Sequence, residues 1–270
     1  MRASGRALRQ RLAAMAGSGD AAGLAEAALL LACLERGDDP APGLAVLQPL
    51  TRGLAAGTGL DAPARAGLLV EHLFVGHGFH GGGDEDEPDL AWLLEHRRGG
   101  PEALGILWLE AARGAGWSAE ALAFPAHFLV RLTDDSGGRA IIDPSGGGRV
   151  LEPPDLRTLM KLRTGLAAEM TPDLFRPLSD RQILLRLQNE AKLRHLRRGD
   201  VSAALAAVEA ALLFAPDQDL LWREAGLMHM RLDHLAAAVA ALEQFIARTG
   251  SGPARLRTQQ LVQEIRARMG

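Results

Sequence analysis

The sequence predicts a mostly helical α+β domain with a small antiparallel sheet, followed by an all-α region of repeated helix pairs. Ala and Leu dominate a chain whose hydrophobic fraction is 47%, a composition that favours buried helices. Two apolar runs, at 124–132 and 140–142, flank the polar turn 134–138, so they predict a β-hairpin. After residue 180, amphipathic helical patterns recur at a fixed spacing, which indicates a repeat.

The first domain is expected to contain helices both before and after the hairpin. Apolar residues at helical spacing, bounded by Gly, Pro and capping Asp residues, mark these segments. The expected helices are at about 5–16, 21–36, 42–55, from Asp61 onward, 90–96, 102–115 and 150–163. Residues 119–124 can form a further strand that leads into the hairpin.

A glycine-rich segment interrupts the helices at 76–83 and continues into the acidic run 84–87. His77 and His80 beside four acidic residues can be read as a metal site. A solvated loop is the favoured interpretation, because the glycines raise the entropic cost of ordering and no compact ligand motif is present. No metal or other cofactor is therefore predicted.

The C-terminal region has the period of a tetratricopeptide repeat. Asp200 and Asp233, each expected to cap a helix, are 33 residues apart, and Ala204 and Ala238 are 34 residues apart. Other residues fit the pattern of such a repeat: Pro216, Trp222 and Gly226. Residues 253–269 are expected to form a final capping helix, which solenoid ends require.

The expected domains are 1–165, with a helical part at 1–75, and 180–270, joined by a linker at 166–179 that contains Pro172 and Pro177. The formal net charge of −3 does not suggest a nucleic-acid-binding protein. The single cysteine, the charged N-terminal helix and the short apolar runs predict a cytoplasmic protein that does not bind membranes.

The hairpin carries the most specific chemistry in the chain. His127 is expected to open the first strand and Asp143 to close the second. The start of one antiparallel strand lies beside the end of its partner, so the two side chains should be neighbours. A carboxylate that orients an imidazole supplies two members of a nucleophile–His–Asp triad.

The third member of the triad is missing where it is expected. In papain-like and transglutaminase-like sites the nucleophile is a cysteine at a helix N-terminus. Here the corresponding helix begins with Gly100, Pro101 and Glu102, and none of these is a nucleophile. Cys33 belongs to an earlier apolar helix and is interpreted as a buried packing thiol, while Ser118 follows the helix at its other end.

The order of these segments resembles the SirB family of bacterial proteins. The segments that carry the resemblance are residues 97–101, 104–107, 124–129 and 142–144, followed by the two repeat-like units. The resemblance covers about residues 20–250. It implies a degraded papain-like or transglutaminase-like domain followed by tetratricopeptide-like repeats, without assured enzymatic activity.

The expected function is that of a non-catalytic scaffold or regulator that acts through protein–protein contacts, with an unknown partner bound by the repeat region. The alternative is a hydrolase or acyl transferase without a cysteine. That enzyme would use His127 and Asp143, with Glu102 or a bound metal in place of the thiol. His127 and Asp143 can equally form a structural pair, Asp143 can anchor a turn, and Glu102 can serve the helix dipole.

One basic cluster bears on the partner. It lies on the first repeat helix and is interpreted as a solvated face, although it can also hold an acidic partner segment. Its members are Lys192, Arg194, His195, Arg197 and Arg198.

Overall fold

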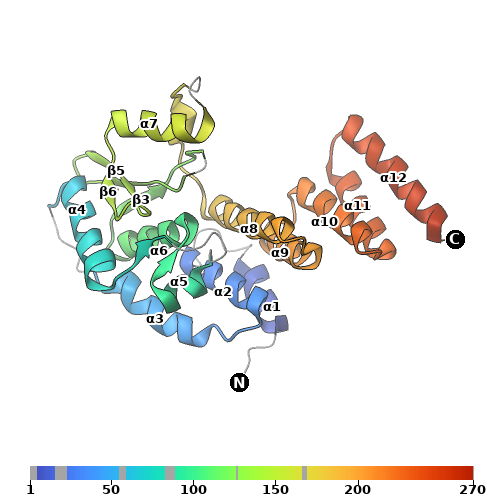
Figure 1. The fold of residues 1–270 in the computed structure, drawn as a ribbon, viewed down its shortest axis with the longest axis horizontal. Helices are drawn as coiled ribbons and strands as arrows, with labels where there is room; N and C mark the ends of the chain where they lie inside the picture. Colours follow the sequence, from blue (N-terminus) through green and yellow to red (C-terminus); the bar gives the residue numbers. More distant parts are fainter. Residues whose placement is uncertain are drawn as a thin grey trace. The chain divides into compact units, whose positions relative to one another are not determined.

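The computed structural model describes residues 5–15, 23–54, 59–82, 89–125, 127–165 and 169–269 (Figure 1). By its internal contacts the chain divides into two compact units. The first is Asp20–Ile183, and the second is Leu184–Gly270 together with Ser4–Gly19. The N-terminal helix therefore groups with the repeat unit, whereas the sequence analysis counts it in the first domain. The division falls within a helix rather than in the expected linker.

The first unit is mostly helical, as predicted. Its helical elements are α2 (Leu24–Arg36), α3 (Ala41–Arg52), α4 (Ala62–Leu69), η2 (Val70–Gly76), α5 (Leu90–His96), α6 (Pro101–Gly114), α7 (Pro153–Thr164) and η3 (Pro172–Phe175). Helix α6 is the buried centre, because every residue from Ala103 to Leu109 is buried. Element η2 is a π-helix that continues α4 directly, and the sequence analysis did not foresee this change of winding.

The sheet confirms the predicted hairpin. Strands β3 (Ser118–Ala121), β4 (Val130–Thr133), β5 (Arg139–Asp143) and β6 (Arg149–Val150) form an antiparallel sheet in that order. Val130 pairs with Ile142 in the β4–β5 register. A second, parallel pair joins β1 (His80–Gly81) to β2 (Arg98–Gly99), which directly precedes α6.

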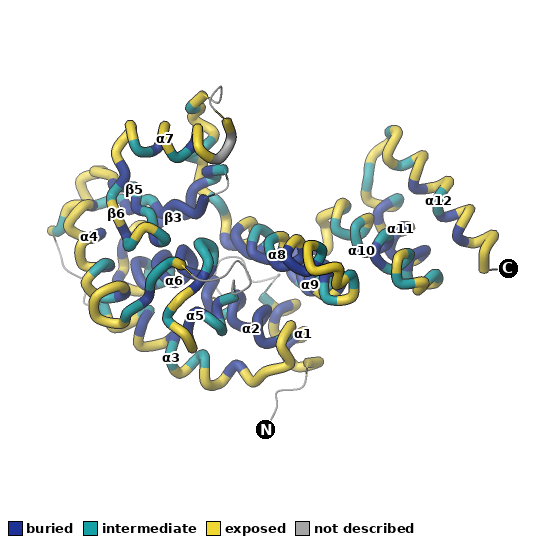
Figure 2. The backbone as a smooth tube through the Cα atoms, viewed as in Figure 1, coloured by how far each residue is buried: buried dark blue, intermediate teal, exposed yellow. Residues whose placement is uncertain are grey.

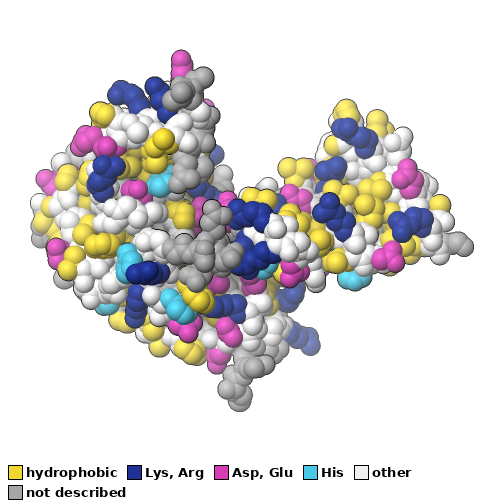
Figure 3. All heavy atoms as spheres, viewed as in Figure 1, with side chains coloured by type: hydrophobic (Ala, Val, Ile, Leu, Met, Phe, Trp, Pro, Cys, Tyr) yellow, Lys and Arg dark blue, Asp and Glu magenta, His cyan; other side chains and the backbone are white. Residues whose placement is uncertain are grey.

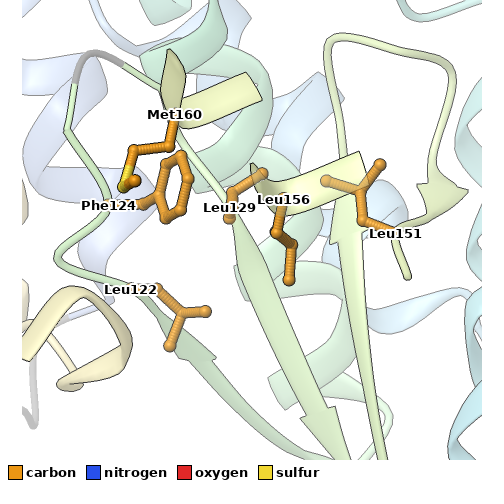
Figure 4. Packing of buried hydrophobic residues seen from close by; sticks show 6 residues of the cluster. All are labelled: Leu122, Phe124, Leu129, Leu151, Leu156 and Met160. Atoms are coloured by element: carbon orange, nitrogen blue, oxygen red, sulfur yellow. The ribbon is translucent and has the colours of Figure 1, made fainter. Parts of the chain in front are cut away.

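A hydrophobic cluster fills the space between α7 and the sheet (Figure 4). Its buried members come from the segment between β3 and β4, from the residue after β6 and from α7: Leu122, Phe124, Leu129, Leu151, Leu156 and Met160. Phe124 and Leu129 lie on either side of His127 in the sequence and are almost fully buried. Burial of such side chains stabilises a fold by about 1.5–3 kcal/mol each. The cluster therefore anchors both ends of the segment that carries His127.

The second unit consists of α1 (Gly5–Met15), most of α8 (Asp180–Arg197), α9 (Val201–Phe214), α10 (Asp219–Arg231), α11 (Leu235–Arg248) and α12 (Pro253–Met269). Consecutive helices contact one another from α9 to α12, and α1 packs against α9. Ala204 and Ala238 are fully buried, as the repeat pattern predicts. Figure 2 shows buried stretches along α8 and α9 in dark blue. A Cβ at Gly226 would lie 2.6 Å from Leu242, so α10 and α11 cross closely there.

The two Asp residues that set the repeat period have different roles. Asp200 caps α9, since its side chain accepts a hydrogen bond from the Ala203 amide at 2.9 Å. The predicted cap at Asp233 is wrong, because Asp233 is left-handed with φ +58° and His234 occupies the cap position of α11. The Asp233 carboxylate lies 3.4 Å from the Arg268 guanidinium instead.

Candidate functional site

The structure brings His127 and Asp143 together. Nε2 of His127 lies 3.0 Å from Oδ1 of Asp143, which confirms the contact expected from the hairpin. Both side chains are largely buried, with exposed fractions of 9% and 15%. The ring N–H is poorly aligned with Oδ1, so neither atom completes a well-directed hydrogen bond with any described residue. The two side chains are therefore close enough to form an ion pair when the imidazole is protonated.

Local structure explains why these two residues meet. Asp143 is the last residue of β5, as predicted, whereas His127 lies before β4 rather than at its start. The β4–β5 pairing ends with Val130 opposite Ile142. Residues 127–129 precede Val130 and form no strand, and they lie beside the turn that follows Asp143. The His127 side chain therefore comes from a non-strand segment, and the next two residues, Phe128 and Leu129, are buried in the hydrophobic core.

Asp143 also anchors its own turn. Burial raises the pKa of Asp143, but the interaction with His127 and the amides of Ser145 and Gly146 outweighs burial and lowers the pKa below its usual value. The backbone carbonyl of Asp143 accepts a hydrogen bond from the Gly148 amide at 2.8 Å. The Asp143 carboxylate therefore contacts His127 and also anchors the turn that follows it.

The beginning of α6 is connected to this turn through the β1–β2 pair. Gly81 packs against the turn so closely that a Cβ there would lie 2.5 Å from the Ser145 carbonyl oxygen. Gly81 pairs with Gly99, and Gly100 is the N-cap of α6. The β1–β2 pair therefore connects the two features, because β1 packs on the Asp143 turn and β2 leads directly into the N-terminus of α6.

Two further close contacts fix α6 against the site. A Cβ on Gly105 would lie 2.0 Å from the ring of Phe128, the residue next to His127. A Cβ on Gly148 would lie 2.1 Å from the ring of Trp108, and Gly148 has φ +77°. The absence of side chains at Gly105 and Gly148 lets the helix approach both segments that carry the His–Asp pair.

The residues at the expected nucleophile position have structural roles. Pro101 is the first residue of α6, and Glu102 is a half-buried acidic residue in its first turn. Proline is favoured at this position because the backbone N–H that it lacks would have no acceptor within the helix. Glutamate is favoured because the helix dipole stabilises a negative charge at the N-terminus. Neither side chain carries a thiol or a hydroxyl group.

Cys33 is buried inside α2, as predicted. Burial, together with the negative charges of Asp38 and Asp89, raises the pKa of its thiol to about 11. Since the thiolate is the reactive form, this environment suppresses nucleophilic chemistry at neutral pH. Ser118 is an exposed residue of β3 at the far end of α6.

The histidines of the glycine-rich segment bind other groups. Nδ1 of His80 lies 2.6 Å from the Gly78 carbonyl oxygen and its Nε2 lies 3.0 Å from Nε of Arg98. Nδ1 therefore carries the proton that it donates to the carbonyl, and Nε2 accepts from Arg98. His77 contacts the His72 carbonyl. Within the described residues, no group of three potential ligands is arranged for a metal ion, and the acidic residues 84–87 lie outside them.

The basic cluster on α8 is only partly solvated, because Arg197 and Arg198 are exposed but the other three members are not, which corrects part of that interpretation. Lys192, Arg194 and His195 are all buried, with exposed fractions of 5–9%. The Lys192 ammonium lies 2.9 Å from the Glu224 carboxylate of α10. The helical period placed these cations on one helix, but it did not show that a neighbouring helix covers them. On the face seen in Figure 3, basic and acidic side chains alternate over the C-terminal helices.

Sequence reasoning missed several residues of the site. Ser145 lies in the Asp143 turn, and its buried hydroxyl has no hydrogen-bond partner among the residues that the structure describes. Gly81 and the π-helix η2 also contribute, since Phe74 and Val70 of η2 pack on the same turn. The glycine run after Ser145 was the available signal, because consecutive glycines permit close approach of other segments.

Comparison with known proteins agrees with this architecture. A model of the transglutaminase-like superfamily matches residues 45–189, which include α6, the sheet and the His127–Asp143 pair. The chain belongs to the transglutaminase-like superfamily. A tetratricopeptide-repeat model matches residues 191–263, so repeat helices follow the transglutaminase-like domain. No solved structure matches the chain.

The chain is also similar to curated bacterial proteins named only UPF0162 proteins. It is 30% identical over 165 residues to one from Xylella fastidiosa strain 9a5c, covering 58% of each chain. It is 28% identical over 184 residues to UPF0162 protein PA3419 of Pseudomonas aeruginosa, covering 66% of each chain. The chain thus spans about 58% of the length of the Xylella relative. No helix in the described segments is both long and apolar enough to cross a bilayer.

Proposed function

We propose that this protein is a non-catalytic, cytoplasmic member of the transglutaminase-like superfamily that acts through protein–protein contacts of its repeat region. The SirB family is the group of bacterial proteins whose pattern it shares. The observation that carries the proposal is the first turn of α6. In this proposal Gly100, Pro101 and Glu102 occupy the position of the nucleophile, and the contact between His127 and Asp143 supplies the other two members of the site.

Retention of the pair has a structural explanation in this proposal. The Asp143 carboxylate holds the 143–148 turn and contacts His127, so it joins the turn to the segment before β4. A hydrogen bond to a charged group, such as those that the amides of Ser145 and Gly146 donate to this carboxylate, contributes about 1.5–3 kcal/mol to stability. The repeat region supplies the binding function, because tetratricopeptide helices form surfaces for partner polypeptides.

A cysteine-less hydrolase or acyl transferase is the second candidate. The 3.0 Å approach of His127 to Asp143 favours it, since this is the geometry of an oriented general base. Glu102 or a metal ion would then help to activate water. The removal of such a base reduces turnover by about a hundredfold or more in a protein that stays folded.

A substrate screen separates the two functions. Wild type and His127→Ala are compared on amide, ester and thioester substrates, with and without added divalent metal, after circular dichroism has confirmed that both are folded. The scaffold proposal predicts no turnover that depends on His127. Metal-dependent or His127-dependent turnover in the wild type would establish the enzyme instead.

A further inference from the structure

A cavity of about 470 Å³ lies between α2, α3 and α5 in the transglutaminase-like unit. Its size falls within the range of small-molecule sites. The floor is apolar and buried, because Leu29, Cys33 and Leu94 have exposed fractions of at most 4%. The thiol of Cys33 has no hydrogen-bond partner among the described residues, so nothing polar on the floor competes for an apolar ligand.

The rim of this cavity is negatively charged. Asp38, Asp39 and Glu95 line it, and Arg36 is its only basic lining residue. The Arg36 guanidinium lies 3.9 Å from Asp38 and 3.8 Å from Asp89, and it stacks over the Trp92 ring at 5.7 Å. These contacts compensate the charge of Arg36 and leave the rim with excess negative charge.

Two of the rim carboxylates are available for a ligand cation. Glu95 is exposed and has only a 4.0 Å contact with His96. Asp39 accepts the Ala41 amide through Oδ1 at 3.0 Å, which leaves the charge of its carboxylate uncompensated. Burial raises the pKa of the Cys33 thiol, and the nearby carboxylates of Asp38 and Asp89 raise it further.

We propose that this cavity binds a small organic cation, namely a primary amine carried on an apolar body. The apolar body would occupy the floor formed by Leu29, Cys33 and Leu94, and the ammonium would lie between Asp39 and Glu95. This site is separate from the His127–Asp143 pair, since none of its lining residues belongs to that site. It also does not depend on whether the protein is an enzyme.

The test uses three probes with the same apolar body: 4-phenylbutylamine, 4-phenylbutanol and 4-phenylbutyrate. Binding to the full chain is measured at pH 7.5 by ligand-observed NMR and isothermal titration calorimetry. The amine should bind at least tenfold more tightly than the alcohol, and the carboxylate should bind least. Equal binding of the amine and the alcohol would overturn the proposal, as would an absence of amine binding.

Two variants locate the site. Asp39→Asn with Glu95→Gln keeps the shape and the amide acceptor but removes both charges, so the preference for the amine over the alcohol should disappear. Val46→Trp should block all three probes by filling the cavity. The matched control is His127→Ala, which should leave amine binding unchanged. Amine binding that persists in both cavity variants, with melting temperatures unchanged, would place the probe elsewhere and contradict the proposal.

Discussion

The contact between Gly105 of α6 and the Phe128 ring makes a quantitative prediction about the site. In an ordinary helix interior, Gly→Ala stabilises by about 1 kcal/mol, because alanine restricts the unfolded chain and favours the helix. At Gly105 the new Cβ would lie 2.0 Å from Cδ1 of Phe128. That atom cannot yield easily, since Phe128 is 1% exposed. Overpacking of this kind costs about 1–3 kcal/mol.

The collision should therefore cancel or outweigh the gain in helix propensity, and Gly105→Ala should destabilise the protein by up to about 2 kcal/mol. Gly67 is the matched control, because it is an exposed helical glycine of α4 with no atom within 4 Å of a new Cβ. Gly67→Ala should increase stability by about 0.5–1 kcal/mol. Thermal and urea unfolding followed by the fluorescence of the buried Trp108 and Trp117 measures both changes. A stabilising Gly105→Ala would refute the close packing of α6 on the His127 segment.

Three further predictions concern pH and packing. Because the pKa of Asp143 is lowered on folding, its ionised form stabilises the fold above the unfolded pKa of about 3.9, and this contribution is lost as pH falls through the lower folded pKa. The difference in unfolding free energy between wild type and Asp143→Asn, measured by urea unfolding, should be constant at pH 5–7 and shrink below about pH 4. A difference that grows in acid would contradict the predicted direction of the pKa shift. Burial raises the pKa of Glu110, so its stabilising neutral form is lost as pH rises through the folded pKa; Glu110→Gln should gain stability relative to wild type above the unfolded pKa of about 4.3, and no gain up to pH 8 would argue against the burial. Ala238→Trp should destabilise the repeat unit by about 1–3 kcal/mol through overpacking against α10, whereas Ala240→Trp at an exposed position of α11 should leave the melting curve unchanged; equal melting of the two variants would show that Ala238 is not at a helix crossing.

Much of the fold could be predicted because its signals are local. Capping residues and apolar periodicity gave helix positions that agree closely with α5, α6 and α12. The turn between the two apolar runs gave the β4–β5 hairpin, and the hairpin gave the His127–Asp143 contact. These features depend on neighbouring residues or on a single short connection.

The features that could not be predicted depend on distant packing. The parallel β1–β2 pair and the ion pair between Lys192 and Glu224 join separate segments of the chain, and the sequence pattern did not mark the π-helix η2. Asp233 shows that a local signal can also mislead. Asp200 and Asp233 both fit the repeat period, but only Asp200 has the backbone geometry of a helix cap. The pattern of a sequence identifies a candidate cap, and the surrounding structure decides whether it is used.

The most direct test of the central claim is to restore the missing nucleophile. Cysteine is introduced singly at Pro101 and at Glu102 in a Cys33→Ser background, so that each protein contains one thiol. If α6 begins opposite an intact His127–Asp143 pair, the thiol pKa at one of these positions should fall at least one unit below the ordinary value of about 8.5. The pH dependence of iodoacetamide labelling measures that pKa, and His127→Ala should return part of the shift. An ordinary pKa at both positions, unchanged by His127→Ala, would show that the helix and the pair do not form a transglutaminase-like site.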